Sequence, residues 1–405
     1  MKRRQFLLLA AATPVAARLR TRPAHCSVPT PPATPERPEH LVQLGRARVD
    51  EDAWLKPSNW KEVWKDPAAL SAVIRSHLDA ENAYASEVLA STQLLQRQLF
   101  TEMSARSGGD DSPPPYSVGA WLYYQRFPPG AQQPNWYRKR RDGSAGEELL
   151  LDGSARAHAN PSFSIINATL SPDQSLFAWA EDATGSERYR IHVKDLRTGA
   201  ILPDPIEDAY GDFVFAADSQ WIFWVLRDAN SRPAQVLRRH LRTGANSVVY
   251  REAAPDVLMT VTSTSSGRYV MIRSWNATSS EVRLICSAKP DGAPRVVEPR
   301  TKGLVYSVED WNGRLVILTN ADGATNFKLM WANESNPGRA GWRDWIPYDS
   351  QRYTIGMWAF RDYFVRLERK DANPSLVVTH AKDMSETRIE REDAAYVIDV
   401  SDHQE

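Results

Sequence analysis

The spacing of apolar residues changes once along the chain. From Leu70 to Met103 they recur at intervals of three and four, which predicts one long amphipathic helix, or two with a break near Ser91 and Thr92. Asp66 followed by Pro67 is typical of a helix start. Beyond the segment SGGDDSPPP, apolar and polar residues alternate with a period of two, so an all-β region follows the helical segment.

The β region is predicted to contain six hairpins in succession. Each consists of two strand-like runs separated by residues typical of turns, such as Asp, Asn, Gly and Pro. The first runs are WLYYQRF, LFAWAED, WIFWVLRD, YVMIRSWN, LVILTNADGATN and YFVRLERKDANP, and their partners are NWYRKRR, RYRIHVKDL, QVLRRHL, EVRLICSA, FKLMWAN and SLVVTHA.

These hairpins repeat at a nearly fixed interval. Equivalent positions in their second strands lie 53, 47, 46, 45 and 49 residues apart, at Trp136, Tyr189, Val236, Val282, Phe327 and Leu376. The phrase KDLRTGAI, residues 194–201, returns 45 residues later as RHLRTGAN, and its Thr-Gly pair is expected in a tight turn. The period has room for four short strands per repeat, which predicts the blades of a β-propeller.

The first 40 residues differ from the rest. Residues 1–21 resemble a twin-arginine export signal, with Arg3 and Arg4 before a short apolar run, although Lys2 stands where Ser or Thr is usual. The run is too short to anchor the chain in a membrane. Residues 22–40 are rich in proline and predict an extended linker. We expect export to the periplasm or beyond the cell; the alternative is an uncleaved tail on a cytoplasmic protein.

Composition excludes several classes of function. The 50 Lys and Arg residues balance 50 Asp and Glu residues, and no basic stripe indicates a nucleic-acid partner. Two cysteines, Cys26 and Cys286, are too few for a disulfide framework and are expected to be unpaired. The eight histidines show no metal-binding spacing, and no glycine-rich phosphate loop occurs, so no metal or cofactor is predicted.

No catalytic residue is predicted in this chain. A serine hydrolase of the α/β type needs Gly-x-Ser-x-Gly at a sharp strand-to-helix turn, and the sequence lacks it. DGSAG, residues 142–146, has the wrong spacing and is interpreted as a hairpin turn. His77 lies on the apolar helical stripe and is expected to be packed rather than catalytic. The basic run Arg138 to Arg141 is expected to be a solvated strand edge.

Several segments resemble the prolyl oligopeptidase family of serine peptidases, and within it the oligopeptidase B (protease II) branch. They are DEDAWLKPSNWKEVWKDP, LDAENAY, EELLLDG, SPDQSLFAWAEDATGSERYRIHVKDLRTG, DANSRPAQVLRRHL and TNADGATNFKL. Only the N-terminal helical and propeller part is covered. The match departs at one loop, where Asp50, Glu51 and Asp52 replace the Asp-Pro-Tyr that the family commonly has.

The resemblance implies a seven-bladed propeller mounted on an α/β-hydrolase domain, with the N-terminal helices packed against that domain. Residues 41–112 would be the helical segment, and residues 113–405 the propeller. The last 13 residues, DAAYVIDVSDHQE, resemble the first strand of blade seven. We therefore expect a mainly β fold of six blades and one further strand, an incomplete ring, and no hydrolase domain within the 405 residues.

The resemblance also implies a function. In the family the propeller tunnel admits short peptides to a Ser, Asp and His triad in the hydrolase domain, and the oligopeptidase B branch cleaves after Lys or Arg. This chain, lacking the triad, is expected to be inactive alone and to gate substrate entry, as a fragment, a truncated reading frame or a split gene. The alternative is a non-catalytic propeller that binds peptides or a protein. Unclosed sheet edges and a bare apolar helical stripe disfavour it.

Overall fold

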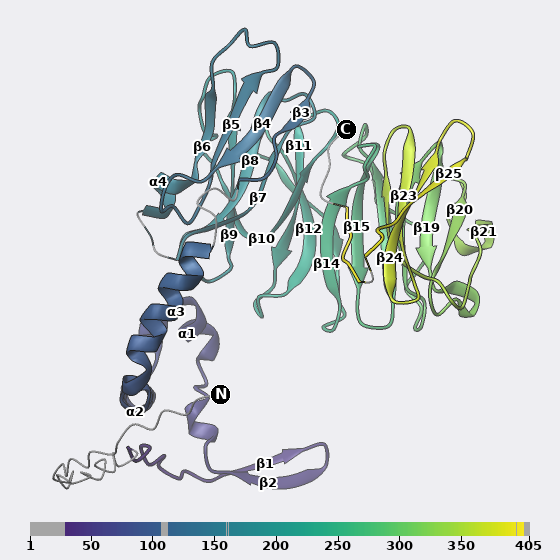
Figure 1. The fold of residues 1–405 in the computed structure, drawn as a ribbon. Helices are drawn as coiled ribbons and strands as arrows, with labels where there is room; N and C mark the ends of the chain where they lie inside the picture. The colour runs from purple at the N-terminus through teal and green to yellow at the C-terminus, as the bar shows by residue number, and fades with distance from the viewer. Residues whose placement is uncertain (1–28, 107–111, 159, 161, 394, 401–405) are drawn as a thin grey trace, which may run out of the picture. The chain divides into compact units, whose positions relative to one another are not determined.

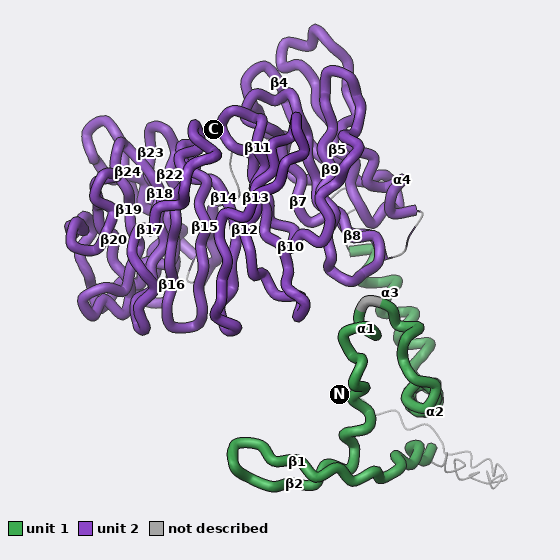
Figure 2. Tube along the Cα trace, turned by 180° about the vertical axis from the view of Figure 1, so that it is seen from behind, with its two compact units in different colours: residues 1–106 green, residues 107–405 purple. Residues whose placement is uncertain are grey.

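A computed structural model describes residues 29–106, 112–158, 160, 162–393 and 395–400. The export signal predicted for residues 1–21 and most of the proline-rich linker lie outside the described residues. The chain divides into two compact units, residues 1–106 and residues 107–405, coloured separately in Figure 2. Among the described residues, no helix has the length and apolar character needed to cross a membrane.

The first unit contains short helices, two longer ones and a hairpin. Its elements are β1 Glu39–Gln43, β2 Arg46–Asp50, η1 Ala53–Leu55, α1 Trp60–Lys65, η2 Pro67–Ala69, α2 Ala72–Leu89, η3 Ala90–Thr92 and α3 Gln93–Arg106. The sequence analysis did not predict the β1–β2 hairpin. Its side chains are almost all exposed, so burial leaves no clear alternating apolar pattern in the sequence.

The predicted break in the long helix is confirmed, whereas its predicted start is wrong. The 3₁₀ turn η3 separates α2 from α3 at residues 90–92. Asp66 caps only the single turn η2, where its Oδ1 accepts a hydrogen bond from Ala68 N (2.9 Å). Helix α2 begins later, at Ala72, and Ser71 Oγ caps it by accepting from Ile74 N.

The second unit contains four four-stranded sheets and one seven-stranded sheet, which together make six blades and confirm the β-propeller architecture (Figure 1). Blade 1 contains β3 Tyr116–Val118, β4 Trp121–Arg126, β5 Asn135–Arg140 and β6 Glu148–Asp152, and α4 Gly153–His158 follows it. Blades 2 and 3 contain β7 Ser164–Leu170, β8 Leu176–Asp182, β9 Tyr189–Asp195, β10 Ile206–Phe215, β11 Trp221–Arg227, β12 Pro233–His240 and β13 Asn246–Arg251.

Blades 4 to 6 follow the same up-and-down order. Blade 4 contains β14 Leu258–Ser263, β15 Tyr269–Trp275, β16 Ser280–Cys286 and β17 Arg295–Val296. Blade 5 contains β18 Tyr306–Trp311, β19 Arg314–Thr319, η4 Ala321–Gly323, β20 Lys328–Ala332, η5 Arg339–Gly341 and β21 Arg343–Ile346. Blade 6 contains β22 Tyr353–Ala359, β23 Tyr363–Lys370, β24 Asn373–His380 and β25 Glu386–Ile389. All neighbouring strands pair antiparallel.

The core consists of five buried clusters, each between two consecutive blades. For example, Phe177 and Trp179 of blade 2 pack with Tyr123 of blade 1, and Phe364 of blade 6 packs with Trp311 of blade 5. None of the five clusters joins blade 6 to blade 1. The alternating apolar residues of each strand therefore serve to bury one blade against the next.

Both copies of the repeated phrase form the same turn. Gly199 and Gly244 adopt positive φ angles of 74° and 69°, and their backbone N–H groups donate to Asp195 O and His240 O. This confirms the predicted tight turn between the third and fourth strands. At the other end of the unit, the described residues 395–400 contain no strand, so the strand expected to begin blade seven does not form there.

Candidate substrate channel

The first strands of consecutive blades lie beside one another: β10 contacts β7 and β14, and β18 contacts β22. We define the six first strands, β3, β7, β10, β14, β18 and β22, as the inner wall. Hydrogen bonds join neighbouring parts of the wall. Thr260 Oγ1 of β14 donates to Asp212 Oδ2 of β10 (2.7 Å), which joins blade 4 to blade 3. The turn after β14 reaches β18 because Ser265 N donates to Glu309 Oε1 (3.0 Å).

A first cavity of about 520 Å³ lies where the inner strands of blades 1 to 4 meet the turns that follow them. Its lining combines apolar residues with polar ones, among them Asn167, Thr169, Asp212, Thr262 and Ser265. Hydroxyl and amide groups can donate or accept hydrogen bonds, so this lining suits an extended peptide backbone. Asp212 adds a carboxylate, which favours a basic segment.

A second cavity of about 380 Å³ lies among the inner strands of blades 5 and 6 and strand β15 of blade 4. We call it the Arg273 cavity. Its lining combines two charged side chains, Arg273 and Glu309, with Phe327, Met357 and Trp358. Residues 305–309, in β18 and just before it, all contribute to the lining.

Glu309 is held by donors from its own strand and from the blade 4 turn. Its Oε1 accepts from Asp310 N (2.9 Å) and Ser265 N (3.0 Å), and its Oε2 accepts from Ser265 Oγ (3.1 Å). Burial raises the pKa of Glu309 to about 7, and the neighbouring Asp310 contributes in the same direction. The carboxyl group can therefore gain or lose a proton near neutral pH.

Arg273 forms no ion pair among the described residues, although the carboxyl group of Glu309 lines the same cavity. No acidic side chain of the described part of the chain lies within ion-pair distance of it, and its buried Nε lacks a hydrogen-bond partner. Its guanidinium carbon lies 5.0 Å from the centre of the Trp275 ring. Desolvation lowers the pKa of Arg273, although the group remains charged at neutral pH.

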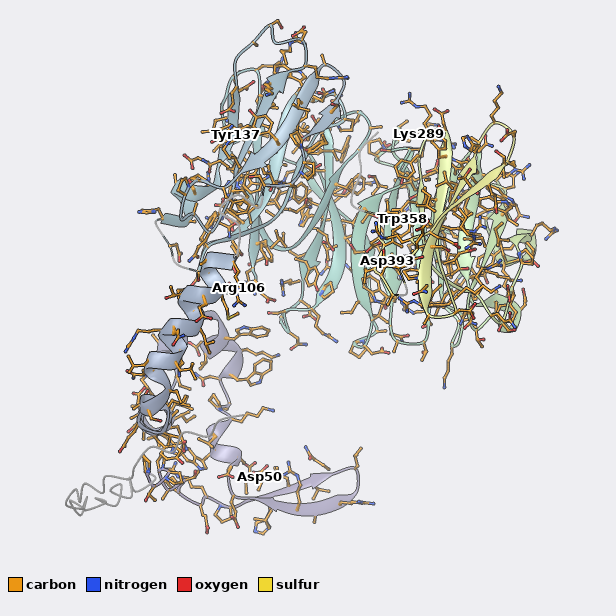
Figure 3. The ribbon with its side chains drawn as sticks, in the orientation of Figure 1. Asp50, Arg106, Tyr137, Lys289, Trp358 and Asp393 are labelled. Atoms are coloured by element: carbon orange, nitrogen blue, oxygen red, sulfur yellow. The ribbon has the colours of Figure 1, made fainter. Side chains whose placement is uncertain are left out.

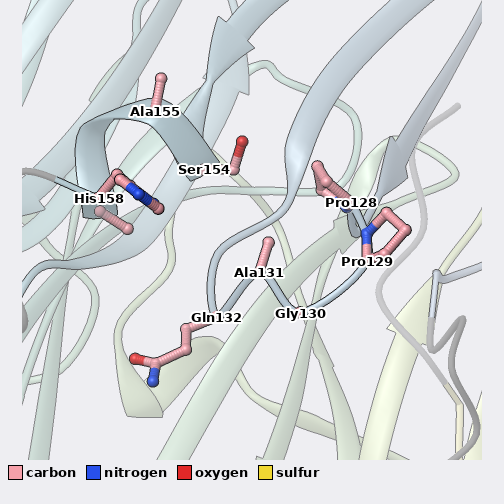
Figure 4. A pocket seen from close by; sticks show the side chains of 9 residues that line it. Pro128, Pro129, Gly130, Ala131, Gln132, Ser154, Ala155 and His158 are labelled. Carbon is pink, nitrogen blue, oxygen red and sulfur yellow. The ribbon is translucent and has the colours of Figure 1, made fainter.

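A third cavity of about 700 Å³ lies between the β4–β5 loop and α4, with Ser154 and His158 in its lining (Figure 4). Ser154 Oγ donates to Asp152 Oδ1 (2.9 Å), and the same Asp152 oxygen accepts from Ala155 N (2.8 Å). These bonds belong to the cap at the start of α4. Asp152 therefore serves as a helix cap, and no histidine of the described residues is hydrogen-bonded to Ser154, as the base of a serine nucleophile usually is.

The structure places the residues singled out in the sequence as follows. His77 is packed, with its ring 5.7 Å from that of Trp54 and its Nε2 3.8 Å from Glu81, as expected. DGSAG lies in the turn between β5 and β6, also as expected. The expectation of a solvated basic edge is wrong for Arg138. This residue is buried at 7% exposure and forms two hydrogen bonds with Glu148.

Sequence reasoning missed Arg273, Glu309 and Trp358. In the sequence, Arg273 appears only as a charged residue within the strand-like run YVMIRSWN, and Glu309 only as one within YSVEDW. Trp358 appears only as a bulky residue within a strand-like run. That signal does not distinguish a solvent-facing position from the inner wall. Cys286 ends strand β16 with a free, exposed thiol, and Cys26 lies outside the described residues. Within the described ranges, no group of three or more His, Cys, Asp or Glu residues could hold a metal ion.

Comparison with known proteins identifies the domain. The family model for the prolyl oligopeptidase N-terminal beta-propeller domain matches residues 32–405. Dipeptidyl aminopeptidase BI of Pseudoxanthomonas mexicana is 31% identical over 92% of this chain and 53% of its own length. Protease 2 of Moraxella lacunata is 28% identical over 83% of this chain and 48% of its own length. The chain thus spans about half the length of these curated relatives.

Solved structures share the fold. Oligopeptidase B from Leishmania major superposes with a TM-score of 0.80 at 22% identity, and the match covers 90% of this chain and 54% of that protein. Oligopeptidase B from Trypanosoma brucei, in a closed form with covalently bound antipain, gives a TM-score of 0.79 over the same shares of the two chains.

Proposed function

Because the chain belongs to the prolyl oligopeptidase family, as its N-terminal propeller domain, we propose that it controls the entry of short peptides to the active site of a serine oligopeptidase. The observation that carries this proposal is the inner wall, with two cavities lined by peptide-binding groups. The 405 residues contain no nucleophile elbow, so catalysis would come from an α/β-hydrolase domain.

We propose that the substrates are short peptides cleaved after Lys or Arg. The relatives named protease 2 and oligopeptidase B support this proposal. The wall supports it as well, since Asp212 contributes a carboxylate to the first cavity and would attract a basic peptide. Folded proteins would be excluded because their chains cannot enter cavities of this size.

The hydrolase domain is the proposed partner of the first unit. Helices α2 and α3 expose large apolar side chains, including Leu94, Leu95, Phe100 and Met103, which a packed domain would cover. We also propose export by the twin-arginine route, which accepts folded proteins. The sequence of residues 1–21 is the only support for that step.

A second activity is favoured by one comparison. Dipeptidyl aminopeptidase BI matches 92% of this chain, and its name denotes release of dipeptides from a free amino end. The two activities differ in whether they need that amino group. A substrate blocked at its amino end therefore separates them.

The test uses the polypeptide encoded by the complete gene and fluorogenic peptides that end in Arg, Lys or Ala, each with a free or an acetylated amino end. We expect cleavage of the blocked Arg and Lys peptides, and none of the same sequence placed inside a folded protein. Cleavage of free dipeptides alone would favour the second activity. A gene that encodes no nucleophile elbow would overturn both, and would leave a non-catalytic peptide-binding propeller.

A further inference from the structure

The Arg273 cavity combines features that indicate a specific ligand. We propose that it binds the carboxylate end of a short peptide whose last side chain is apolar. This proposal rests on the proposed function, because it assumes that peptides enter along the inner wall. It adds a chemical role for three side chains, Arg273, Met357 and Trp358, which line the same cavity.

The guanidinium of Arg273 has no ion-pair partner among the described residues. A partly buried charge without a partner is costly, and most buried charged groups in folded proteins are paired. Arg300 and Arg366 of this unit pair with carboxylates at 3.0 and 2.6 Å, and Arg238 and Arg239 donate to backbone carbonyl groups instead. Arg273 has neither kind of contact among the described residues, and its Nε lacks a hydrogen-bond partner. A ligand carboxylate would supply the missing charge and could accept two parallel hydrogen bonds.

Part of the cavity lining is apolar. Strand β22 has an irregular register between Thr354 and Gly356, and the Trp358 ring lies over Gly356 (Trp358 is labelled in Figure 3). A Cβ at Gly356 would lie 2.8 Å from that ring, so only glycine leaves room for the tryptophan. Met357 and Phe327 extend this surface. A cavity of about 380 Å³ is within the range of small-ligand sites, which span roughly 300–1,000 Å³.

Glu309 affects which anion fits the cavity. It lines the same cavity as Arg273, and both of its oxygens already accept hydrogen bonds from the protein. Its carboxyl group disfavours ligands with several negative charges, such as phosphates, more than it disfavours a single carboxylate. The apolar walls add affinity only for a ligand that carries an apolar group beside its charge. A peptide C-terminus with an apolar last residue meets both conditions.

The test is direct binding to the full 405-residue chain, measured by calorimetry. The probe is the tripeptide Ala-Ala-Phe with a free carboxylate, and the matched ligand is the same tripeptide with a C-terminal amide. We expect the amide to bind roughly 10- to 100-fold more weakly, the effect typical of losing a charge-assisted hydrogen bond. Arg273→Met should weaken binding of the free acid by a similar factor and leave the amide unaffected.

Two further variants serve as controls. Arg251→Met removes the same charge from an exposed position on the outer strand β13, and should bind the free acid as the unaltered chain does. Ser307→Trp fills the cavity without changing charge, and should lose the free acid as well. Melting temperatures identify any variant that fails to fold.

Equal binding of acid and amide, or unchanged binding of the acid to Arg273→Met, would overturn the inference. Neither result would bear on the proposed function, which is tested by hydrolysis with the complete gene product. Conversely, if Arg273→Met lost binding of the free-acid tripeptide, the inference about this cavity would hold even if the gene product cleaved no peptide.

Discussion

At the residue scale, charged side chains at the blade interfaces are mostly paired across them. Arg300 of the segment after β17 contacts Glu252 after β13, and Arg268 of blade 4 contacts Glu334 and Asp310 of blade 5. Each charged side chain in such a pair has one correct partner on the next blade, so these pairs help to fix how consecutive blades align. Glu309 differs, because hydrogen bonds alone hold it and burial raises its pKa.

Glu309 should make stability depend on pH. Its carboxyl group titrates near pH 7 in the folded chain and near 4.5 when exposed. As the pH rises from about 4.5 to 7, the unfolded chain loses its proton first, so the free energy of unfolding falls. A tenfold change in proton affinity corresponds to about 1.4 kcal/mol, so the free energy of unfolding falls by at most a few kcal/mol over this pH range. We predict that Glu309→Gln melts higher than the unaltered chain at about pH 8, with the difference vanishing near pH 4.

Glu334 provides the matched control. Its hydrogen bond with Arg268 lowers the pKa of Glu334, so its contribution to stability is present above about pH 4.5 and is lost as the pH falls through the lowered pKa. Glu334→Gln should therefore lower the melting temperature at about pH 8. If both substitutions changed the melting temperature in the same direction at that pH, the assignment of a raised pKa to Glu309 would be contradicted.

At the element scale, one strand belongs to two blades. The first part of β10 pairs with β9 of blade 2, and its later part pairs with β11 of blade 3, with an irregular register between Ala209 and Phe213. Gly211 lies in that irregular stretch with a φ of 118°, which side chains rarely tolerate. A Cβ there would lie 2.1 Å from Ile166 Cδ1. Glycine thus allows the strand to pass from one blade to the next.

We predict that Gly211→Ala lowers the free energy of unfolding by about 2 kcal/mol or more, from backbone strain and the clash with Ile166 together. Chemical denaturation measures this difference. Gly146→Ala is the control, because Gly146 has open space around it and no positive φ angle is recorded there. Equal stability of the two variants would show that β10 does not depend on glycine at this point.

The elements also show how far the sequence predicts the fold. All six predicted hairpins are present, and the strands β8 and β11 begin at the predicted residues, Leu176 and Trp221. These predictions succeeded because the strands are short apolar runs bounded by turn residues, and β8 and β11 are buried along most of their length on both faces. The β1–β2 hairpin was missed because its exposed side chains carry no such constraint.

At the scale of the whole molecule, the first unit exposes large apolar side chains along its last helix. Leu94, Leu95, Leu99, Phe100 and Met103 of α3 are all exposed, by 46% to 76%. Contiguous apolar surface of this kind promotes association with another protein surface. The 405-residue chain should therefore self-associate when its proposed hydrolase partner is absent.

We predict that the double variant Leu95→Glu, Leu99→Glu shifts the 405-residue chain toward the monomer, because charges on the stripe oppose burial of its apolar surface. Size-exclusion chromatography with light scattering over a range of concentrations measures this shift. Val42→Glu changes a single exposed apolar residue of the β1–β2 hairpin and should leave association unchanged. A monomeric unaltered chain would argue against an unsatisfied partner surface on α3.

The sequence by itself determined the helical segment with its break, the repeated four-stranded units and the family. Each of these depends on local periodicity or on a matched segment, and both are readable along the chain. Only the tertiary structure decided that Arg138 is buried against Glu148, that β10 serves two blades and that Arg273, Glu309 and Trp358 line one cavity. Arg273, Glu309 and Trp358 lie in three different blades. The alternation of residues along a strand shows which of them share a face, but it does not show which faces of separate blades come into contact.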